Sequence, residues 1–382
     1  MHISKDGVRY AHAMLIMEVT MKKLRVGFIG TGGIANAHMR AYQQIPEVEI
    51  VGGADIIPGK AREFLDRYEL TDAKDFTSAA ELLKMDLDAV SVCTYNSTHA
   101  ECTVAALEAG VHVLCEKPMS ITLAEGVEMC RAEKKSGKIL TIGFQPRYDE
   151  NSRHIKELVQ SGLLGDVYYV QSGGGRRRGI PGSTFIDKDK AGVGALADIG
   201  CYALDFGLNT IGYPKPLTVS AVAYDYFGKN PKYYKESDRF SVDDFSAAFI
   251  RLEGGITFDF RMSWAMHMDT CGDFIFLGKN AGLKVRQPHF ELWGGAWDGP
   301  IGEITLMHDD ENGTPTSSKI DIIPQEKSNL FYKKVRSFVD AILNGTEAPV
   351  PTSQILYNQA IIDGIIRSSE LGREVEIVIP EI

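Results

Sequence analysis

Short apolar runs alternate with amphipathic segments over the first third of the chain. Such runs predict buried strands, and apolar residues repeated every three to four positions predict helices. The expected strands are residues 26–29, 48–51, 88–93, 111–115 and 139–142. The expected helices are residues 33–44, 58–68, 78–84, 97–109 and 123–136. This alternation indicates an α/β fold with a doubly wound parallel sheet.

The pattern changes after residue 143. A helix is expected over 151–161, followed by longer strands in which apolar and polar positions alternate: 167–171, 217–224, 245–252, 256–263 and 270–277. Alternation of this kind is typical of an antiparallel sheet with one covered face. Two final helices, 329–343 and 353–369, are expected to pack back across a domain junction. We therefore expect an N-terminal extension (1–21), a nucleotide-binding domain (22–144) and a second domain (145–382) that binds substrate and forms oligomers.

A glycine-rich turn, Gly30-Thr-Gly-Gly-Ile-Ala35, follows the first expected strand. Gly30 suits a tight turn, Gly32 lets the backbone approach a pyrophosphate, and the small Ala35 lets the next helix pack closely. The N-terminus of that helix favours phosphate. Asp55 follows the second strand at the spacing needed to bind ribose hydroxyls. A chance turn before an amphipathic helix would explain the glycines but not Asp55, so the pattern predicts a nicotinamide dinucleotide site.

The choice of dinucleotide depends on the residues around Asp55. A carboxylate repels a 2′-phosphate, which favours NAD, whereas Lys60 and Arg62 leave NADP open.

Composition excludes several classes of protein. The formal charge of −10 argues against binding to a nucleic acid backbone. No apolar run approaches the roughly 18 residues of a membrane span. The six cysteines form no Cys-x-x-Cys pair and are expected to be reduced core residues of a cytoplasmic protein. The nine histidines show no metal-binding spacing, so no metal site is expected.

Three further motifs carry polar residues at positions where a ligand could bind. Residues 94–99 and 115–118 each follow an expected parallel strand, and the carboxyl ends of such strands bind ligands in this architecture. The first motif could equally cap a helix, and the second, with Glu116, Lys117 and Pro118, could be a salt-bridged turn. In the third motif, Asp198, Tyr202 and Asp205 are spaced to share one helical face. Asp198 could instead cap that helix, and Tyr202 could be a core residue.

Taken together, these motifs resemble the Gfo/Idh/MocA oxidoreductase family, to which glucose–fructose oxidoreductase and inositol dehydrogenase belong. The resemblance spans residues 22–372 and rests on Asn96-Ser-Thr-His99, Glu116-Lys-Pro118, Gly143-Phe-Gln-Pro-Arg147, Leu164-Gly-Asp-Val167 and Asp198-Ile-Gly-Cys-Tyr202. It implies a Rossmann domain followed by an α+β domain with an open, mostly antiparallel sheet. Two departures are Tyr202, which is histidine in many members, and Tyr95, where proline is usual.

The resemblance also implies roles for individual residues. Lys117, Tyr202 and Asp198 are the expected catalytic residues, and the same three with Arg147 are expected to bind substrate. The expected cofactor-binding residues are Gly30, Gly32, Gly33, Ile34, Asp55, Thr94, Asn96, His99, Glu116 and Lys117. The Lys117 ammonium would lower the pKa of Tyr202, which would then take the substrate's hydroxyl proton.

The expected function is NAD(P)-dependent oxidation of a secondary hydroxyl of a sugar, glycoside or cyclitol, by a homodimer or homotetramer built through the C-terminal sheet. Two alternatives stay open: a glycoside-cleaving enzyme that uses transient oxidation and elimination, and a non-catalytic dinucleotide sensor. The basic loop 173–182 could line the substrate pocket or be a solvated turn.

Overall fold

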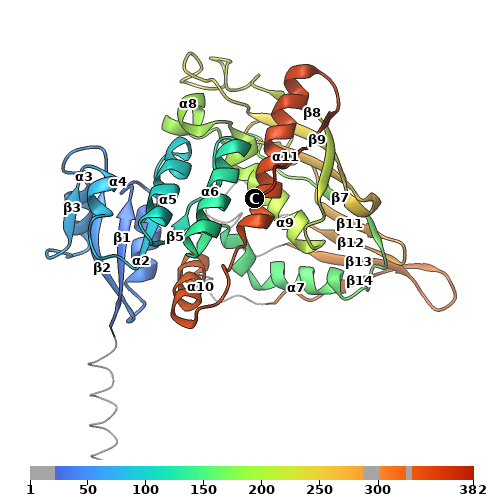
Figure 1. Cartoon of the computed structure of the whole chain (residues 1–382). Helices are drawn as coiled ribbons and strands as arrows, with labels where there is room; N and C mark the ends of the chain where they lie inside the picture. The colour runs from blue at the N-terminus through green and yellow to red at the C-terminus, as the bar shows by residue number, and fades with distance from the viewer. Residues whose placement is uncertain (1–21, 287–301, 324–328) are drawn as a thin grey trace, which may run out of the picture.

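A six-stranded parallel sheet forms the N-terminal third of the computed structural model (Figure 1), which describes residues 22–286, 302–323 and 329–382. The strand order is β3-β2-β1-β4-β5-β6, so the direction of winding reverses between β1 and β4. A crevice at such a reversal is where dinucleotides bind in this fold. The strands are β1 (Leu24–Ile29), β2 (Val48–Ala54), β3 (Lys74–Phe76), β4 (Ala89–Val92), β5 (His112–Cys115) and β6 (Leu140–Ile142).

Helices cover both faces of this sheet, as the alternating pattern predicted. They are α2 (Ala35–Tyr42), α3 (Lys60–Arg67), α4 (Ala79–Leu82), α5 (His99–Glu108) and α6 (Leu123–Ser136). Helix α6 has the bounds that the sequence predicts because both ends carry strong signals. Thr122 and Glu125 form a capping box, and Gly137 ends the helix with φ 65°.

A nine-stranded sheet forms the second half, in the order β14-β13-β12-β11-β7-β10-β9-β8-β15. Strands β7 and β10 pair in parallel, and the other neighbouring pairs are antiparallel. The strands are β7 (Val167–Ser172), β8 (Pro216–Tyr224), β9 (Phe245–Leu252), β10 (Thr257–Ser263), β11 (Phe274–Gly278), β12 (Ala281–Val285), β13 (Ile304–Asp309), β14 (Pro315–Ile320) and β15 (Val375–Glu376). The mixed, mostly antiparallel sheet confirms the expected fold class. The sequence patterns missed β3 and β12–β15. Of these, β3 and β15 have only three and two residues, and β14 is mostly polar.

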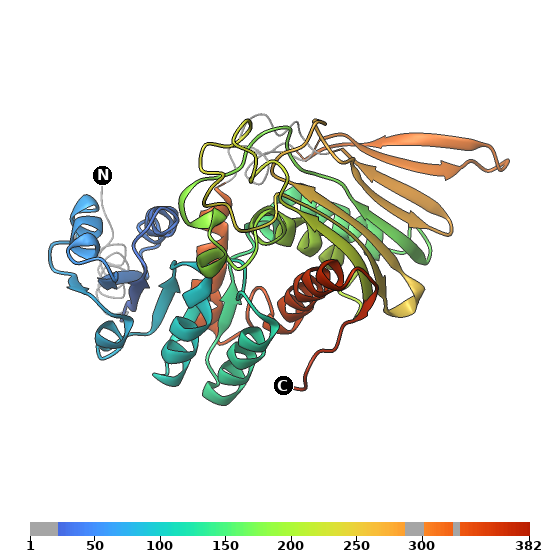
Figure 2. The same cartoon turned by 90° about the horizontal axis from the view of Figure 1, so that it is seen from above.

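Helices α7 (Glu150–Gln160), α9 (Cys201–Thr210) and α11 (Thr352–Leu371) lie between the two sheets or beside the second one, and α8 (Lys188–Ala191) lies near the junction. Figure 2 shows α11 between α6 and the second sheet, and it contacts both α6 and β8. Helix α10 (Leu330–Asn344) packs on α2, where Val335 and Phe338 share a core with Val26 and Phe28. The last third of the chain therefore reaches back to the first sheet, while the exact domain limits stay a prediction.

A π-helical segment, Leu196–Gly200, leads directly into α9. Short 3-10 helices lie at Asn96–Thr98, Gln145–Tyr148, Ser183–Ile186 and Glu253–Gly255. The run Lys188–Thr210 is long and apolar enough to cross a membrane by composition, but 89% of its apolar window is buried inside the protein. This run, which contains α8, the π-helical segment and α9, is therefore part of the core. Residues 1–21, the expected N-terminal extension, lie outside the described residues.

Candidate active site

The glycine turn lies at the carboxyl end of β1, beside the end of β4. Gly30 has φ +85°, and a Cβ atom there would lie 2.6 Å from the carbonyl oxygen of Cys93. Only glycine fits this close approach. Cβ atoms at Gly32 and Gly33 would meet nothing within 4 Å. The turn thus leaves an open cradle in front of α2, whose N-cap residue Ile34 makes no side-chain capping bond. This arrangement fits a pyrophosphate.

Asp55 lies at the end of β2, facing the glycine turn. Its Oδ2 accepts hydrogen bonds from Thr31 N at 3.0 Å and Thr31 Oγ1 at 2.9 Å, and it lies 3.3 Å from Lys60 Nζ. Burial opposes ionisation of Asp55, but the hydrogen bonds from Thr31 and Ile57 and the charge of Lys60 lower its pKa. Arg62 turns away to the carbonyl groups of Leu70 and Ala73. Of the two cations that left NADP open, Lys60 alone lies at the Asp55 carboxylate.

Lys117 and Asp198 form an ion pair between the two halves of the molecule, which we call the outer pair. Lys117 Nζ donates to Asp198 Oδ1 at 3.0 Å and to the Asp198 carbonyl oxygen at 2.8 Å. Trp264 Nε1, at the end of β10, donates to Asp198 Oδ2 at 3.0 Å. Burial opposes the charge on Lys117, but Asp198 raises its pKa, so the side chain is an ammonium at neutral pH. Trp264 was not identified from the sequence.

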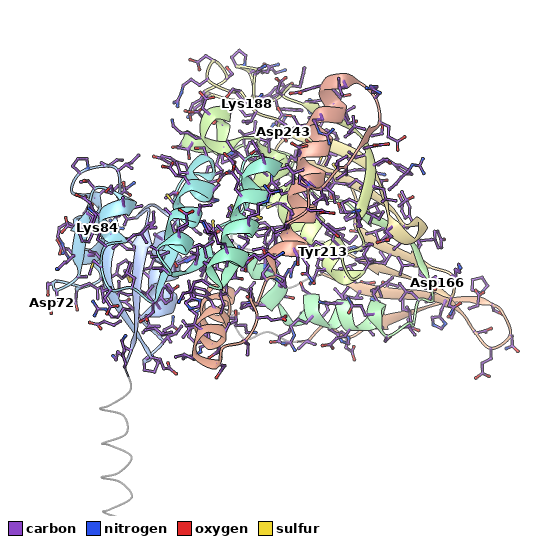
Figure 3. All side chains as sticks on the ribbon, in the orientation of Figure 1. Asp72, Lys84, Asp166, Lys188, Tyr213 and Asp243 are labelled. Carbon is purple, nitrogen blue, oxygen red and sulfur yellow. The ribbon has the colours of Figure 1, made fainter. Side chains whose placement is uncertain are left out.

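The π-helical segment that carries Asp198 is anchored at its start by Asp243. Asp243, labelled in Figure 3, accepts hydrogen bonds from Gly194 N at 2.6 Å and Leu196 N at 2.9 Å. It therefore satisfies backbone donors at the start of the helical run that carries Asp198. The loss of these contacts would leave the Asp198 backbone free to shift relative to Lys117.

Tyr202 lies next to the outer pair but differs from the expectation. Lys117 Nζ lies 4.9 Å from the centre of the Tyr202 ring, and Gln145 Nε2 donates to the Tyr202 hydroxyl at 2.7 Å. Burial, reinforced by the nearby Glu116 carboxylate, raises the pKa of Tyr202 well above its usual value. The expected lowering of this pKa by Lys117 is therefore wrong, because the ammonium faces the ring and desolvation dominates. Tyr202 is a neutral hydroxyl at physiological pH.

Glu116 points in the opposite direction from its neighbour Lys117. Its side chain is 5% exposed, and its carboxylate contacts His38 and Lys334. Burial opposes ionisation, but Lys334 and His38 hold the pKa of Glu116 far below its usual value. The expected contact between this carboxylate and a cofactor is therefore corrected to an internal ion pair. Neither His38 nor Lys334 was identified from the sequence, because α2 and α10 are far apart along the chain.

Three expected cofactor residues line the carboxyl end of β4 and the start of α5. The Thr94 backbone nitrogen lies next to Gly30, since a Cβ atom at Gly30 would lie 2.9 Å from this nitrogen. Asn96 Nδ2 donates to the carbonyl of Ala191 at 3.0 Å, which ties this loop to α8. His99 Nδ1 lies 2.8 Å from the Pro118 carbonyl, whereas its buried Nε2 has no hydrogen-bond partner. These residues stay candidates for cofactor contact.

Arg147 has an internal role, which corrects the expectation that it binds substrate. Its guanidinium donates to both carboxylate oxygens of Asp205, from Nη2 at 2.6 Å and from Nε at 3.0 and 3.2 Å, and to Gln354 at 2.7 Å. It also lies over the ring of Tyr213. Asp205 is therefore engaged by Arg147 and Tyr213, not by Lys117. Gln145, two residues before Arg147, is the member of this motif that reaches the site.

The basic loop 173–182 packs against the segment that follows β10. Arg176 is 4% exposed, and its Nη1 donates to the carbonyl of Gly179 at 3.0 Å. Arg178 lies over the rings of Phe227 and Tyr233, at 4.8 and 5.0 Å. The loop is thus packed against other parts of the protein. Burial lowers the pKa of Arg176, and the nearby Asp198 carboxylate partly offsets this lowering. Within the described ranges, no group of three or more His, Cys, Asp or Glu side chains could hold a metal ion, and all six cysteines are free thiols.

Two family models match this chain. Residues 24–144 match the oxidoreductase family with an NAD-binding Rossmann fold, and residues 152–284 match the C-terminal domain of the same Gfo/Idh/MocA family. The chain belongs to this family.

Two known relatives are similar along most of the chain. The D-glucoside 3-dehydrogenase of Escherichia coli (strain K12) is 27% identical over 94% of this chain and 99% of its own length. A scyllo-inositol 2-dehydrogenase (NADP(+)) of Bacillus subtilis (strain 168) is 25% identical over 84% of this chain and 92% of its own. Levoglucosan dehydrogenase, solved in complex with NADH, has the same fold, with a TM-score of 0.78, 21% identity and coverage of 94% of this chain and 100% of its own.

Proposed function

We propose that this protein oxidises a secondary hydroxyl of a sugar, glycoside or cyclitol and uses NAD as the hydride acceptor. The observation that carries the proposal is the outer pair. It places an ammonium and a carboxylate, 3.0 Å apart, at the junction between the dinucleotide fold and the second sheet. The names of relatives that act on glucosides and inositol support the substrate class.

The family's dinucleotide fits the site on three observations: the glycine cradle, the ionised Asp55 at the end of β2, and the unpartnered Nε2 of the buried His99. Gly30, Gly32, Gly33 and Ile34 would hold the pyrophosphate, and Asp55 the adenosine ribose. When bound, NAD supplies the hydride acceptor, whereas the protein supplies orientation and electrostatics.

The protein's own residues would divide the remaining work among three groups. Lys117, held as an ammonium by Asp198, would stabilise the developing alkoxide. Asp198 accepts single hydrogen bonds on each oxygen from Lys117 and Trp264, so each oxygen keeps capacity to bind a sugar hydroxyl or to accept its proton. Tyr202, kept neutral by burial, would orient the substrate by hydrogen bonding.

A pair of variants tests these roles. If Asp198 accepts the proton, Asp198→Asn should lower kcat by about 10²-fold or more. Tyr202→Phe should raise KM while largely keeping kcat, because it removes an orienting hydroxyl and no base. A large loss of kcat in Tyr202→Phe, with a shifted pH–rate profile, would return the proton-transfer role to the tyrosine.

The substrate is found by a screen of methyl glucosides, free sugars and inositols, read by nicotinamide absorbance with NAD and with NADP. Accumulation of one NADH per substrate oxidised indicates a dehydrogenase. Glycoside cleavage without net NADH would support transient oxidation and elimination, and binding without turnover would support a sensor.

We further propose a cytoplasmic homo-oligomer built through the open face of the second sheet. Val222 and Tyr224 of β8 and Phe249 of β9 lie on one face of this sheet by strand register, and their side chains are 39%, 55% and 45% exposed. An exposed apolar surface of this kind favours association. Sedimentation velocity measures the subunit count.

A further inference from the structure

Glu116 and Lys334 form a second ion pair, which we call the inner pair. Lys334 comes from α10, near the end of the chain, and its Nζ contacts Glu116 Oε1. The side chains are 1% and 5% exposed, compared with 15% and 8% for Lys117 and Asp198 of the outer pair. The Lys334 ammonium lies over the ring of Phe331, with Nζ 4.4 Å from the ring centre, and this contact helps to fix it.

A hydrogen-bonded chain completes the surroundings of the inner pair. His38 Nε2 lies 2.7 Å from Glu116 Oε1, and His38 Nδ1 lies 3.1 Å from Ser91 Oγ, which is 3.1 Å from the Tyr42 hydroxyl. An ionised carboxylate only accepts, so His38 donates from Nε2. Burial and the charge of Lys334 lower the pKa of His38, so the ring is neutral and accepts at Nδ1. Ser91 therefore donates to His38, and Tyr42 donates to Ser91. Each donor hydrogen from Tyr42 to His38 thus makes one hydrogen bond, and this network fixes the orientation of the Glu116 carboxylate.

The inner pair lies directly behind both strand ends that carry the active site. Glu116 Oε2 accepts from the backbone nitrogen of Lys117 at 3.3 Å. A Cβ atom at Gly143, at the end of β6, would lie 2.8 Å from Glu116 Oε1 and 3.2 Å from Lys334 Nζ. Two residues later, Gln145 donates to Tyr202. The pair thus supports Lys117 from one strand end and Gln145 from the next.

We propose that Lys334 is a positioning residue that acts through Glu116 to hold the Lys117 turn against Asp198. Buried ion pairs add little net stability compared with apolar side chains of similar size, so stability alone is a weak reason for such a pair. Its placement behind the Lys117 backbone gives it a geometric role. The inference rests on the proposed function, because the position of Lys117 affects turnover only if Lys117 takes part in the reaction.

The test compares Lys334→Met with Lys333→Met, a neighbouring lysine on α10 whose ion pair with Glu150 is 38% and 35% exposed. Three quantities are measured: NAD affinity by protein fluorescence, kcat and KM with the best substrate of the screen, and acetylation of Lys117 by acetic anhydride, quantified by peptide mass spectrometry. The acetylation assay needs no turnover and reports the position of Lys117 directly.

In Lys334→Met we expect kcat to fall by about tenfold to a hundredfold, because a small misplacement of a reacting group costs that much. NAD affinity should stay within about threefold of the native value, since the glycine cradle is unchanged. Acetylation of Lys117 should become about threefold faster or more, because a loosened turn exposes the amine. Lys333→Met should match the native protein in all three. Native kcat or native Lys117 acetylation in a folded Lys334→Met overturns the inference.

A double variant covers the case in which Lys334→Met does not fold. Glu116→Gln/Lys334→Met removes both charges and leaves no unpaired carboxylate, and it should fold but show the same loss of kcat and the same faster acetylation. Native values in this variant, or failure of both variants to fold, reject a positioning role. Lys117→Met separates the two hypotheses. If it keeps native turnover, the proposed function fails. If it loses turnover while Lys334→Met keeps it, this inference alone fails.

Discussion

The inner and outer pairs begin at adjacent residues, and the comparison between them shows how one turn serves two purposes. Glu116 and Lys117 follow β5 and point in opposite directions, so their charges enter different surroundings. Glu116 meets Lys334 in a sealed core, whereas Lys117 meets Asp198 where the two halves of the molecule face each other. A sealed pair can only hold geometry, because no substrate reaches it.

The partners of the two pairs also come from different parts of the fold. Asp198 belongs to a π-helical segment beside the second sheet, and Lys334 belongs to a helix that packs on α2 of the first. The Lys117 turn is therefore fixed from both sides by elements that follow it in the chain. The nucleotide-binding fold alone cannot assemble this site.

The largest expected effect comes from removing the ammonium of the outer pair, which is the more exposed of the two pairs. Lys117→Met should lower turnover by about 10²–10⁴-fold, because the ammonium that stabilises the alkoxide is lost. NAD binding should persist, as measured by fluorescence titration. Near-native turnover in a folded variant would mean that the outer pair is structural like the inner one.

For stability, the order of the two effects should reverse: the loss of Lys334 should lower the free energy of unfolding more than the loss of Lys117. Lys334→Met leaves the Glu116 carboxylate buried and unpaired, which should lower the free energy of unfolding by about 3–5 kcal/mol. Lys117→Met should cost less, about 1–2 kcal/mol, because water reaches part of the outer pair. Urea unfolding of both variants measures the difference. Equal losses would show that depth of burial does not separate the pairs.

The first sheet could be predicted almost completely from the sequence, because its elements carry local signals. Gly30 with Asp55 predicted the cradle, and the apolar pattern predicted the bounds of α6, which the structure shows to be capped at both ends. The weakly patterned β14 could not be predicted, because five of its six residues are exposed and polar or proline. Its place in the sheet comes from pairing with β13.

The site could be predicted only in part. Lys117, Asp198 and Tyr202 were found through their motifs, and the structure brings them together. Lys334, His38 and Trp264 could not be found, because each contacts Glu116 or Asp198 from a distant part of the chain. The direction of the Tyr202 pKa was missed for a related reason: desolvation depends on packing density, which no motif encodes.

Lys60 and Asp55 form a third lysine–carboxylate pair, whose lysine is more exposed than those of the inner and outer pairs. The Lys60 side chain is 35% exposed, so water competes for its charge. NAD should bind more tightly than NADP, and Asp55→Ser should narrow this preference by about tenfold, since it removes a repelling carboxylate and frees Lys60 for a 2′-phosphate. Fluorescence titration with both dinucleotides measures this. Equal affinities in the native protein would contradict the role given to Asp55.

The smallest expected effect concerns Asp244, a buried carboxylate. It accepts hydrogen bonds from backbone groups, whereas the carboxylates of the inner and outer pairs contact lysine side chains. Asp244 is 1% exposed, and its Oδ2 accepts from Gly228 N at 2.6 Å, while its carbonyl accepts from Trp264 N at 2.8 Å. Burial, with a smaller contribution from Asp243, raises the pKa of Asp244 to about 6. No ammonium among the described residues offsets its burial, so its pKa moves in the opposite direction from that of Glu116.

This difference has a definite sign in stability. The pKa of Asp244 in the folded protein lies above the unfolded value of about 3.9, so the protonated carboxyl favours the fold. Its contribution is complete below about pH 4 and is lost as the pH rises through about 6, with a total of about 3 kcal/mol, because the two pKa values differ by about two units. Asp244→Asn cannot titrate, so its free energy of unfolding relative to the native protein should rise by about 1–2 kcal/mol between about pH 4.5 and pH 7.5. Asp238→Asn, at an exposed aspartate, should show no such change. Parallel urea-unfolding profiles for native and Asp244→Asn proteins would show that backbone donors stabilise a buried carboxylate as well as lysine does.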